Sequence, residues 1–395
     1  MKKDHLMSLK YLLILTVPIF IELLLQLVVG YSDQFMMKKY ENAVNGITNA
    51  NVINNMIINA FTVFSSAAII LITQYKGAKD ETHERSVYSV AFYFNFIVSL
   101  VFSLIILGLG RFFLKWLQVP ELSYNDALLY LMITGGLLFF QTMSTTLSSL
   151  LKANSCMKES MVINLIVNLI NILGNYFLIK VFAKIDLPIG QASRISGVNP
   201  ADIAQLIIYI KKVGIPLSVK VFKSEMGQTG IKLLKLGAPS GGESVSYNSS
   251  QIIIQLCANQ IVKYNGNNIG MGNIKTYASM FAMVTYMFTS AISQAMQVII
   301  GELLGAGRTV DTNKKVKQTA LISLCASTTI AILFFILSNY AFKIFDVYDP
   351  ELLALGHKIM FVEIFLEIGR AFNIVFVRSL QTSGSVIRGR SPMKI

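Results

Sequence analysis

Apolar segments of about 20 residues recur along this chain, and each is long enough to cross the hydrocarbon core of a bilayer as an α-helix. The 395 residues are 54% hydrophobic and only 14% charged, and the mean hydropathy is +0.59. Water-soluble domains carry about 25% charged residues, so the composition argues against a soluble globular fold. The sequence therefore predicts an all-α polytopic membrane protein.

Ten segments have the length and composition expected of membrane-spanning helices. The sixth is a poor span because Arg194, Pro200 and Asp202 follow one another closely at its start. A basic, weakly amphipathic stretch at 213–235 is predicted to be a cytoplasmic connector that lies along the membrane surface. The predicted spans are approximately 11–37, 50–75, 86–110, 127–151, 160–180, a sixth ending near Ile210, 236–262, 276–303, 319–342 and 352–380.

The formal charge of +13 is explained by membrane orientation. Lys and Arg gather in alternate loops, about 21 on one side and about 11 on the other, and cytoplasmic loops carry such an excess. We therefore expect a multi-pass protein of the cell (plasma) membrane with a cytoplasmic N-terminus and no nucleic-acid partner. Cys156, Cys257 and Cys325 are scattered, without the spacing of metal ligands.

An internal repeat divides the chain into two halves. The segment "ITQYKGAKDETHERSV" is similar to "VIIGELLGAGRTVDTNKKV". At an offset of 228 positions, Asp80 corresponds to Arg308 and Lys115 to Lys343, so the offset holds across two spans. Self-similarity at a fixed offset indicates a duplication.

The repeat predicts three parts of the chain. They are an N-terminal helical bundle at 1–212 with spans one to six, the connector at 213–235, and a C-terminal bundle at 236–395 with spans seven to ten. An even number of spans precedes the second copy, so both bundles should share one orientation and be related by an axis along the membrane normal. Bundles of this kind commonly rock about a site between them.

The first span carries two acids. Glu22 and Asp33 are 11 residues apart, which places them on nearly the same helix face, with Gln26 close to that stripe. A charged side chain at mid-bilayer costs about 2.5–3.5 kcal/mol, so the stripe predicts the wall of an aqueous cavity. An acid there can bind Na⁺ through oxygen or exchange it for a proton.

Simpler interpretations of both acids remain open. Asp33 lies shortly before Lys38 and Lys39, so it can instead be an interfacial acid that reaches outward. Glu22 is equally consistent with packing onto the connector or with an ion pair to Lys10 or Lys235.

The seventh span has a polar face like that of the first, and both spans open with Pro-x-x-x-Glu. Its polar residues recur at helical spacing, so we expect the two opening helices to line a central cavity that attracts cationic drugs. The residues expected on this face are Glu243, Tyr247, Gln251 and Gln255.

Polar groups in two further spans have structural interpretations. Asparagine side chains follow one side of span five and can hold neighbouring helices together through hydrogen bonds. In span ten, Glu363 and Glu367 are one turn apart and Arg370 follows, so a structural ion pair inside the bundle is the simpler account. The amides of span five are Asn164, Asn168, Asn171 and Asn175.

Several motifs together resemble the multidrug and toxic compound extrusion (MATE) family, over nearly all of the chain. They are the span from Pro18 to Asp33 and the segments "TQYKGAKD", "NLIVNLINILGNYFLI", "LKLGAPSGGE" and "GELLGAGR". The resemblance implies a MATE or MOP-flippase-like fold of two homologous six-helix bundles. By the same resemblance the second bundle is expected to be incomplete, because the chain ends after the tenth predicted span, two spans short of the family pattern.

The resemblance also assigns roles to particular residues. It makes Asp33 the carboxylate that couples transport to a cation or proton, with Asn171 and Asn175 in the hydrogen-bond network around it. Pro18 becomes a hinge that lets the first span bend. Many members carry an Asp where this chain has Asn175, and losing that charge weakens a cation site.

The function implied is secondary active efflux of organic cations or amphipathic drugs, in antiport with Na⁺ or H⁺ by alternating access. We expect no catalytic residues, no cofactor, no metal beyond Na⁺ at Asp33, and a monomer in the lipid bilayer. The alternatives are a flippase of the same fold for lipid-linked polysaccharide or peptidoglycan precursors, and a truncated product without transport. An intramembrane enzyme is disfavoured because the sequence contains no His-Glu-x-x-His or nucleophile motif.

Overall fold

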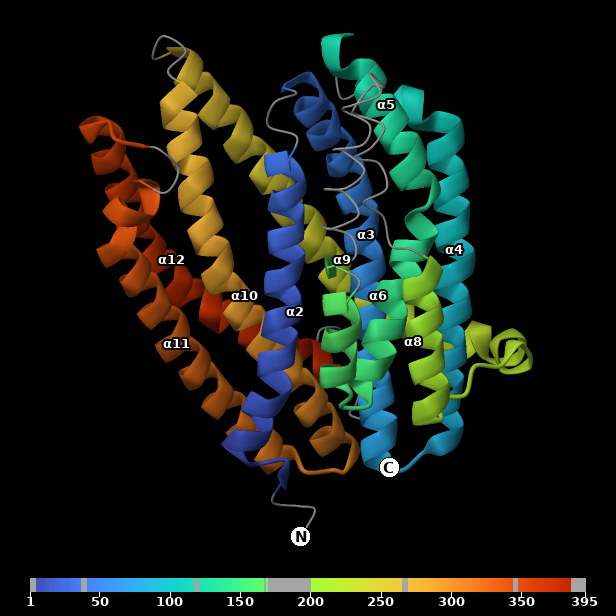
Figure 1. The fold of residues 1–395 in the computed structure, drawn as a ribbon. Helices are drawn as coiled ribbons and strands as arrows, with labels where there is room; N and C mark the ends of the chain where they lie inside the picture. The colour runs from blue at the N-terminus through green and yellow to red at the C-terminus, as the bar shows by residue number, and fades with distance from the viewer. Residues whose placement is uncertain are drawn as a thin grey trace. The chain divides into compact units, whose positions relative to one another are not determined.

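The structure, a computed structural model, consists of α-helices joined by short turns in the residues it describes (Figure 1), which confirms the predicted all-α class. It describes residues 5–36, 41–116, 121–166, 168–169, 200–264, 269–343 and 347–384. The helices are α2 Leu9–Met36, α3 Glu41–Ala78, α4 Glu81–Trp116, α5 Glu121–Gly136, α6 Leu138–Ala153, α8 Pro200–Val213, α9 Val219–Tyr264, α10 Ile269–Gly305, α11 Thr309–Lys343 and α12 Pro350–Thr382. Residues 157–166 are also helical.

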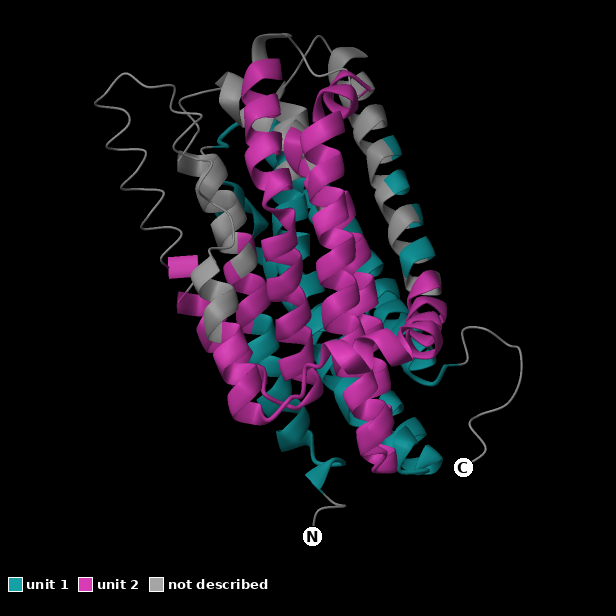
Figure 2. Cartoon of the chain, turned by 90° about the vertical axis from the view of Figure 1, so that its right-hand side faces the viewer, with its two compact units in different colours: residues 1–20, 239–395 teal, residues 21–238 magenta. Residues whose placement is uncertain are grey.

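The chain forms two compact units, coloured separately in Figure 2. Unit 1 contains Met1–Phe20 and Pro239–Ile395, and unit 2 contains Ile21–Ala238. The expected bundles at 1–212 and 236–395 differ from these units mainly at the start of α2, which packs with the second repeat. The division between the units therefore falls inside α2 and inside α9.

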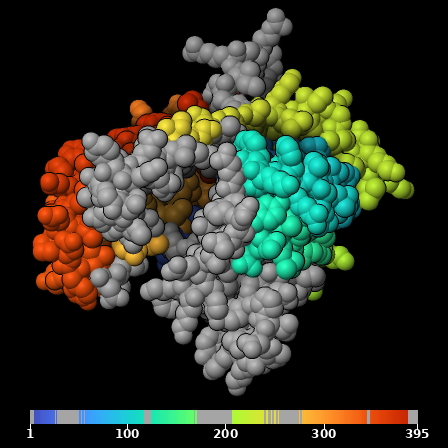
Figure 3. Space-filling model, turned by 90° about the horizontal axis from the view of Figure 1, so that it is seen from above, coloured from blue at the N-terminus to red at the C-terminus, as the bar shows by residue number. Residues whose placement is uncertain are grey.

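Unit 2 is built on α3, α4, α5 and α6, which pack against one another. Their apolar core includes Phe61 from α3, Ile106 and Leu114 from α4, and Leu131 from α5. The ends of α4 and α5 also lie together in the view from above (Figure 3). This arrangement follows from the apolar faces of the helices, which bury side chains at helical spacing.

The predicted single span at 127–151 is wrong in one respect, because the chain breaks there into α5 and α6, which are bent by 45°. Gly135 and Gly136 end α5 directly against α4, where a Cβ on Gly135 would lie 2.5 Å from Cγ2 of Ile106. Glycine favours close approach and weakens a helix, which accounts for the break. Ser103 accepts a hydrogen bond from the backbone N–H of Phe139 (3.2 Å), one of the first free donors of α6.

Unit 1 repeats this architecture with α10, α11 and α12, which also pack against one another. A cluster around Ile274, Ala278, Phe342 and Met360 forms one of its apolar cores. Here α12 is one continuous helix, in contrast to α5 and α6. Its start is defined by Asp349, whose carboxylate accepts a hydrogen bond from the N–H of Glu351 (2.9 Å), with Pro350 at the first helical position.

Four of the described helices are long and apolar enough to cross a membrane, and the bent pair of α5 and α6 makes a fifth if it counts as one span. The protein is a multi-pass membrane protein. Part of the predicted connector is continuous with the seventh span, because α9 begins at Val219 and runs through to Tyr264. Residues 186–199 of the irregular sixth segment lie outside the described residues, and α8 begins at Pro200.

Candidate functional site

Helix α2 carries the acids that the sequence singles out. Its first half buries Leu12, Leu15 and Ile19, which recur at three and four residues and so share one face. Pro18 is buried in the same turn. Proline has no N–H to donate to the carbonyl of Ile14, so one backbone hydrogen bond of the helix is missing here and the helix bends more easily at Pro18.

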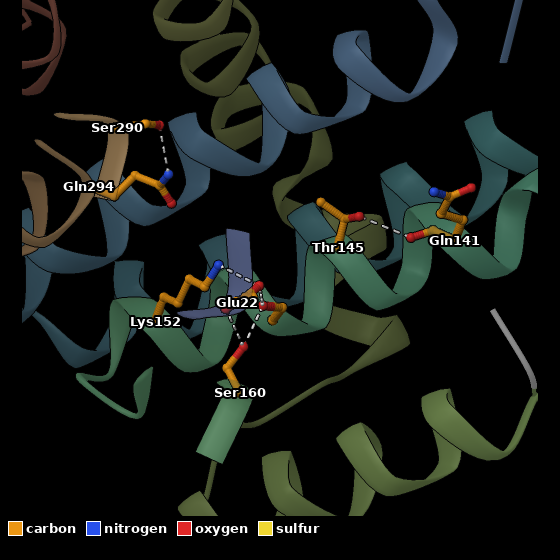
Figure 4. A network of polar contacts seen from close by, with 8 residues as sticks. Glu22, Gln141, Thr145, Lys152, Ser160, Ser290 and Gln294 are labelled. Atoms are coloured by element: carbon orange, nitrogen blue, oxygen red, sulfur yellow. Dashed lines mark hydrogen bonds and ion pairs between the residues drawn. The ribbon is translucent and has the colours of Figure 1, made fainter. Parts of the chain in front are cut away.

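Glu22 is buried and bound by three side chains from its own unit (Figure 4). Its Oε1 accepts hydrogen bonds from Nζ of Lys152 at 2.9 Å and from Oγ of Ser148 at 3.4 Å. Oε2 accepts a hydrogen bond from Oγ of Ser160 at 3.4 Å, and the two serine hydroxyls are 2.6 Å apart. The partner of Glu22 is therefore Lys152 of α6, and not Lys10 or Lys235.

The Glu22 and Lys152 side chains are only 4% and 12% exposed. An ion pair so far from water is stable only if the remaining oxygen lone pairs also find donors, and the two serines supply them. The pair neutralises both charges within unit 2. Nothing in the sequence pattern pointed to Lys152, because the two partners are 130 positions apart and only the folding of the chain brings α2 and α6 together.

Most of the other predicted site residues lie beyond the structural description. Asn171 and Asn175 are outside the described residues, whereas Asn164 lies in the helical segment 157–166 and is half-buried. The remaining predicted residues lie in helices α2 and α9, but their side chains are not among those described, and their roles stay predictions. They are Gln26 and Asp33 in α2 and Glu243, Tyr247, Gln251 and Gln255 in α9.

The ion pair predicted in span ten is confirmed and is part of a three-residue cluster in α12. The guanidinium of Arg370 donates to Oε1 of Glu367 and, at 3.3 Å, to Oε1 of Glu363. The Glu363 side chain is 16% exposed and that of Glu367 is fully buried. Oε2 of Glu367 accepts no hydrogen bond from any donor among the described residues. The ring of Tyr286 in α10 lies 5.9 Å from the guanidinium.

This α12 cluster has more acidic than basic groups, since two carboxyl groups share one guanidinium. A net charge inside a transmembrane bundle is expensive, so it attracts a proton or a cation. Among the described residues, no group of three or more His, Cys, Asp or Glu side chains is arranged to hold a metal ion.

A polar seam, which the sequence interpretation missed, joins α3, α4 and α6 in unit 2. Nδ2 of Asn95 donates to Oγ1 of Thr146 at 2.8 Å and to Oγ of Ser65 at 3.2 Å. Further along, Nδ2 of Asn154 donates to the hydroxyl of Tyr88 at 2.7 Å. Such bonds hold membrane helices together, and the signal that could have found them is the serine and asparagine spacing of four along α4.

Comparisons with known proteins agree with the duplicated architecture. A sequence model of the MatE family matches residues 18–177 and 239–389, one segment in each half. The chain is 29% identical over 378 residues to "Uncharacterized transporter YisQ" of Bacillus subtilis (strain 168), an alignment that covers 94% of this chain and 81% of that protein.

Solved structures share the fold at low sequence identity. A crystal structure of MATE in complex with MaL6 has a TM-score of 0.82 and 12% identity, over 95% of this chain and 83% of that chain. The eukaryotic MATE transporter AtDTX14 has a TM-score of 0.79 and 16% identity, over 95% and 83%. A MOP superfamily transporter from Pyrococcus furiosus Vc1 (DSM3638), described as having a binding pocket of reverse polarity, has a TM-score of 0.78 and 12% identity, over 95% and 82%.

Proposed function

The chain belongs to the multidrug and toxic compound extrusion (MATE) family of membrane transporters, and from this premise we propose that it exports organic cations or amphipathic drugs in antiport with Na⁺ or H⁺ by alternating access. Members of this family are transporters and not enzymes. The exporter acts as a monomer in the cell membrane, with its N-terminus in the cytoplasm.

The observation that carries this proposal is the unbalanced charge of the α12 cluster. Two carboxyl groups, those of Glu363 and Glu367, face the single guanidinium of Arg370, so the cluster can take up one further positive charge, either a proton or a cation. A cation or proton that enters the interior of unit 1 relieves this imbalance, whereas an anion increases it. The cluster therefore supports exchange of cations.

We assign coupling to Asp33, because the other acid of α2 is already neutralised. Glu22 forms a buried ion pair with Lys152. Because Lys152 already neutralises this carboxylate, Glu22 attracts a second cation or a proton only weakly. Asp33 then remains as the acid of α2 that can exchange Na⁺ or H⁺, with Asn171 and Asn175 hydrogen-bonded around it and Pro18 as the hinge.

The substrate cavity is assigned to polar residues of the two opening helices. Amide and phenol groups orient an organic cation, and an acid attracts it. The residues assigned to the cavity are Gln26, Glu243, Tyr247, Gln251 and Gln255. Glu22, which the sequence placed in this cavity, is left out because it is buried in the ion pair with Lys152.

A flippase for diphosphate-linked lipid precursors is the second candidate. Such a substrate requires cations that can bind phosphate oxygens. Among the described residues, the fully buried Lys315 and the partly buried Lys152 and Arg370 are each bonded to oxygen atoms of the chain. Cation export is therefore the better supported of the two functions.

The proposal is tested by reconstituting the chain in liposomes and following efflux of a fluorescent organic cation under an imposed Na⁺ or H⁺ gradient. We expect efflux to depend on one of the two gradients and Asp33→Asn to abolish that dependence. The matched control is Glu81→Gln, because this carboxylate is 79% exposed and lies at the start of α4. Efflux by Asp33→Asn equal to that of the parent chain would show that coupling lies elsewhere.

A further inference from the structure

Lys315 of α11 is an isolated buried cation. Its side chain is fully buried, and its Nζ donates to the carbonyl oxygens of Ser8 at 3.1 Å and Met7 at 3.4 Å and to Oε1 of Gln318 at 3.4 Å. No carboxylate is among these bonds to described residues. Burying an ammonium group without a carboxylate costs several kcal/mol, so packing alone does not account for a lysine at this position.

The internal repeat provides a comparison for this position. The residue that corresponds to Lys315 in the first half, 228 positions earlier, is Val87, which is also fully buried. An apolar residue therefore fits the same place in the same architecture. The lysine adds hydrogen bonds to two carbonyls at the start of α2, which ties this end of the helix to α11 within unit 1.

A second buried lysine holds the other half of α2. Lys152 of α6 bonds to Glu22 within unit 2, as described above. The two lysines therefore bind the chain directly before α2, at residues 7–8, and within α2, at residue 22. The division between the units falls between Phe20 and Ile21, two residues after Pro18.

We propose that Lys315 and Lys152 are positioning residues that fasten the two halves of α2 to unit 1 and unit 2, and that both contacts persist throughout transport. Any movement of one unit against the other then bends α2 in the short segment at Pro18, where a backbone hydrogen bond is missing. The second half of α2, which carries Asp33, moves rigidly with unit 2. This role in coupling rests on the proposed function of Asp33.

Hydrogen–deuterium exchange tests the fastening directly, without any transport measurement. We expect Lys315→Met to raise exchange of backbone amides in residues 9–17 and to leave residues 22–36 unchanged. The double variant Glu22→Gln with Lys152→Met should do the reverse. Exchange that rises throughout α11 and α12 with Lys315→Met, or that rises nowhere, contradicts the proposal.

Efflux measurements then test the effect on coupling. Misplacing a reacting group by about 1 Å can lower a rate about a hundredfold, so we expect Lys315→Met to lower gradient-driven efflux about tenfold or more while binding of the organic cation in detergent stays within about twofold. Lys315→Arg should restore efflux, because its guanidinium can donate to the same carbonyls. Parallel loss of binding, folding yield and efflux indicates a merely structural lysine and overturns the assignment.

A crosslink on the folded chain covers the case in which Lys315→Met fails to fold. With the native cysteines replaced by serine, Ser8→Cys and Gln318→Cys are bridged by a short bis-methanethiosulfonate reagent. Both positions lie beside the Nζ of Lys315, and Lys315 itself stays in place. We expect the bridged protein to keep its efflux, because the contact does not open during the cycle. Inhibition that dithiothreitol reverses shows that the contact must break, which overturns the proposal. If the unmodified parent chain shows no efflux, the proposed function is wrong. The hydrogen–deuterium exchange experiment still tests whether Lys315 and Lys152 hold the two halves of α2.

Discussion

Lys79 and Gly307 adopt the same left-handed backbone conformation at the ends of equivalent helices, with φ of 61° and 72°. Lys79 follows α3 and Gly307 follows α10, and the two residues are 228 positions apart. The surrounding hydrogen bonds also correspond, since the N–H of Asp80 bonds to the carbonyl of Tyr75 and that of Arg308 to the carbonyl of Leu303, both at 2.9 Å. The duplication has thus kept one helix-ending turn, with glycine in only one copy.

This difference predicts opposite effects of two substitutions on stability. A residue with a Cβ pays about 1–2 kcal/mol in the left-handed region, so Lys79→Gly should raise the free energy of unfolding by up to about 1 kcal/mol. Gly307→Ala should lower it by about 1 kcal/mol, because a Cβ there meets no atom within 4 Å and only the backbone is strained. Thermal unfolding in detergent measures both, and equal shifts of the same sign contradict the argument.

The next residue of the turn predicts a dependence on pH. Oδ1 of Asp80 accepts a hydrogen bond from the backbone N–H of His83 (3.1 Å), and Oδ2 lies 2.7 Å from the Nδ1 of His83. The backbone bond, helped by the His83 side chain, lowers the pKa of Asp80. A lowered folded-state pKa stabilises the fold above the unfolded value of about 3.9, and this contribution disappears as the pH falls through the folded value.

We therefore expect the melting temperature of the parent chain to fall as the pH drops below about 4, and Asp80→Asn to make that decline shallower. Glu81→Gln removes an equal charge from the same turn and should leave the decline as it is in the parent. A decline in Asp80→Asn as steep as in the parent would assign the acid sensitivity to other groups.

Much of the architecture could be predicted from the sequence because its signals are local or periodic. The spans follow from apolar length, and the duplication follows from pairs such as Asp80 and Arg308. The ion pair of Glu363 and Glu367 with Arg370 was also predictable, because residues three and four apart on one helix are neighbours.

The parts that could not be predicted depend on contacts between distant segments. Lys152 lies just past the end of a predicted span, where a lysine is expected in a loop, yet it is the partner of Glu22. Lys315 stands between Lys314 and Lys317 in an apparently solvated run, and only the phase of α11 places it inside. The break at Gly135 could not be predicted because an average over an apolar window does not register that the Ile106 side chain packs directly against the backbone of one glycine.

The bend between α5 and α6 predicts that glycine is required at its start. In Gly135→Ala the new Cβ would lie 2.5 Å from Cγ2 of Ile106, a methyl group on a branched Cβ that cannot rotate away freely. Overpacking of this kind costs about 1–3 kcal/mol. Gly108→Ala in α4 is the matched control, because nothing lies within 4 Å of its Cβ, and it should stabilise the helix by about 0.5–1 kcal/mol. Equal melting temperatures for the two variants would contradict the packing explanation.

The Glu22 and Lys152 pair predicts strong coupling between two substitutions. Removing one partner of a buried pair leaves an uncompensated charge and costs about 3–5 kcal/mol, whereas replacing both with neutral groups is often nearly neutral. We expect Lys152→Met alone to be severely destabilising and Glu22→Gln with Lys152→Met to recover most of the loss. Additive effects in this double-mutant cycle would mean that the two side chains do not interact in the folded protein.

The α12 cluster predicts opposite signs for removal of its cation and of one acid. Arg370→Met leaves two buried carboxylates without a counter-charge and should lower the free energy of unfolding by about 3–5 kcal/mol. Glu363→Gln leaves the pair of Glu367 and Arg370 balanced, so stability should rise by on the order of 1 kcal/mol while binding of an organic cation weakens. Melting temperatures and cation titrations in detergent measure both effects. If Glu363→Gln destabilises the protein as much as Arg370→Met, the cluster carries no excess negative charge, and its support for cation export is lost.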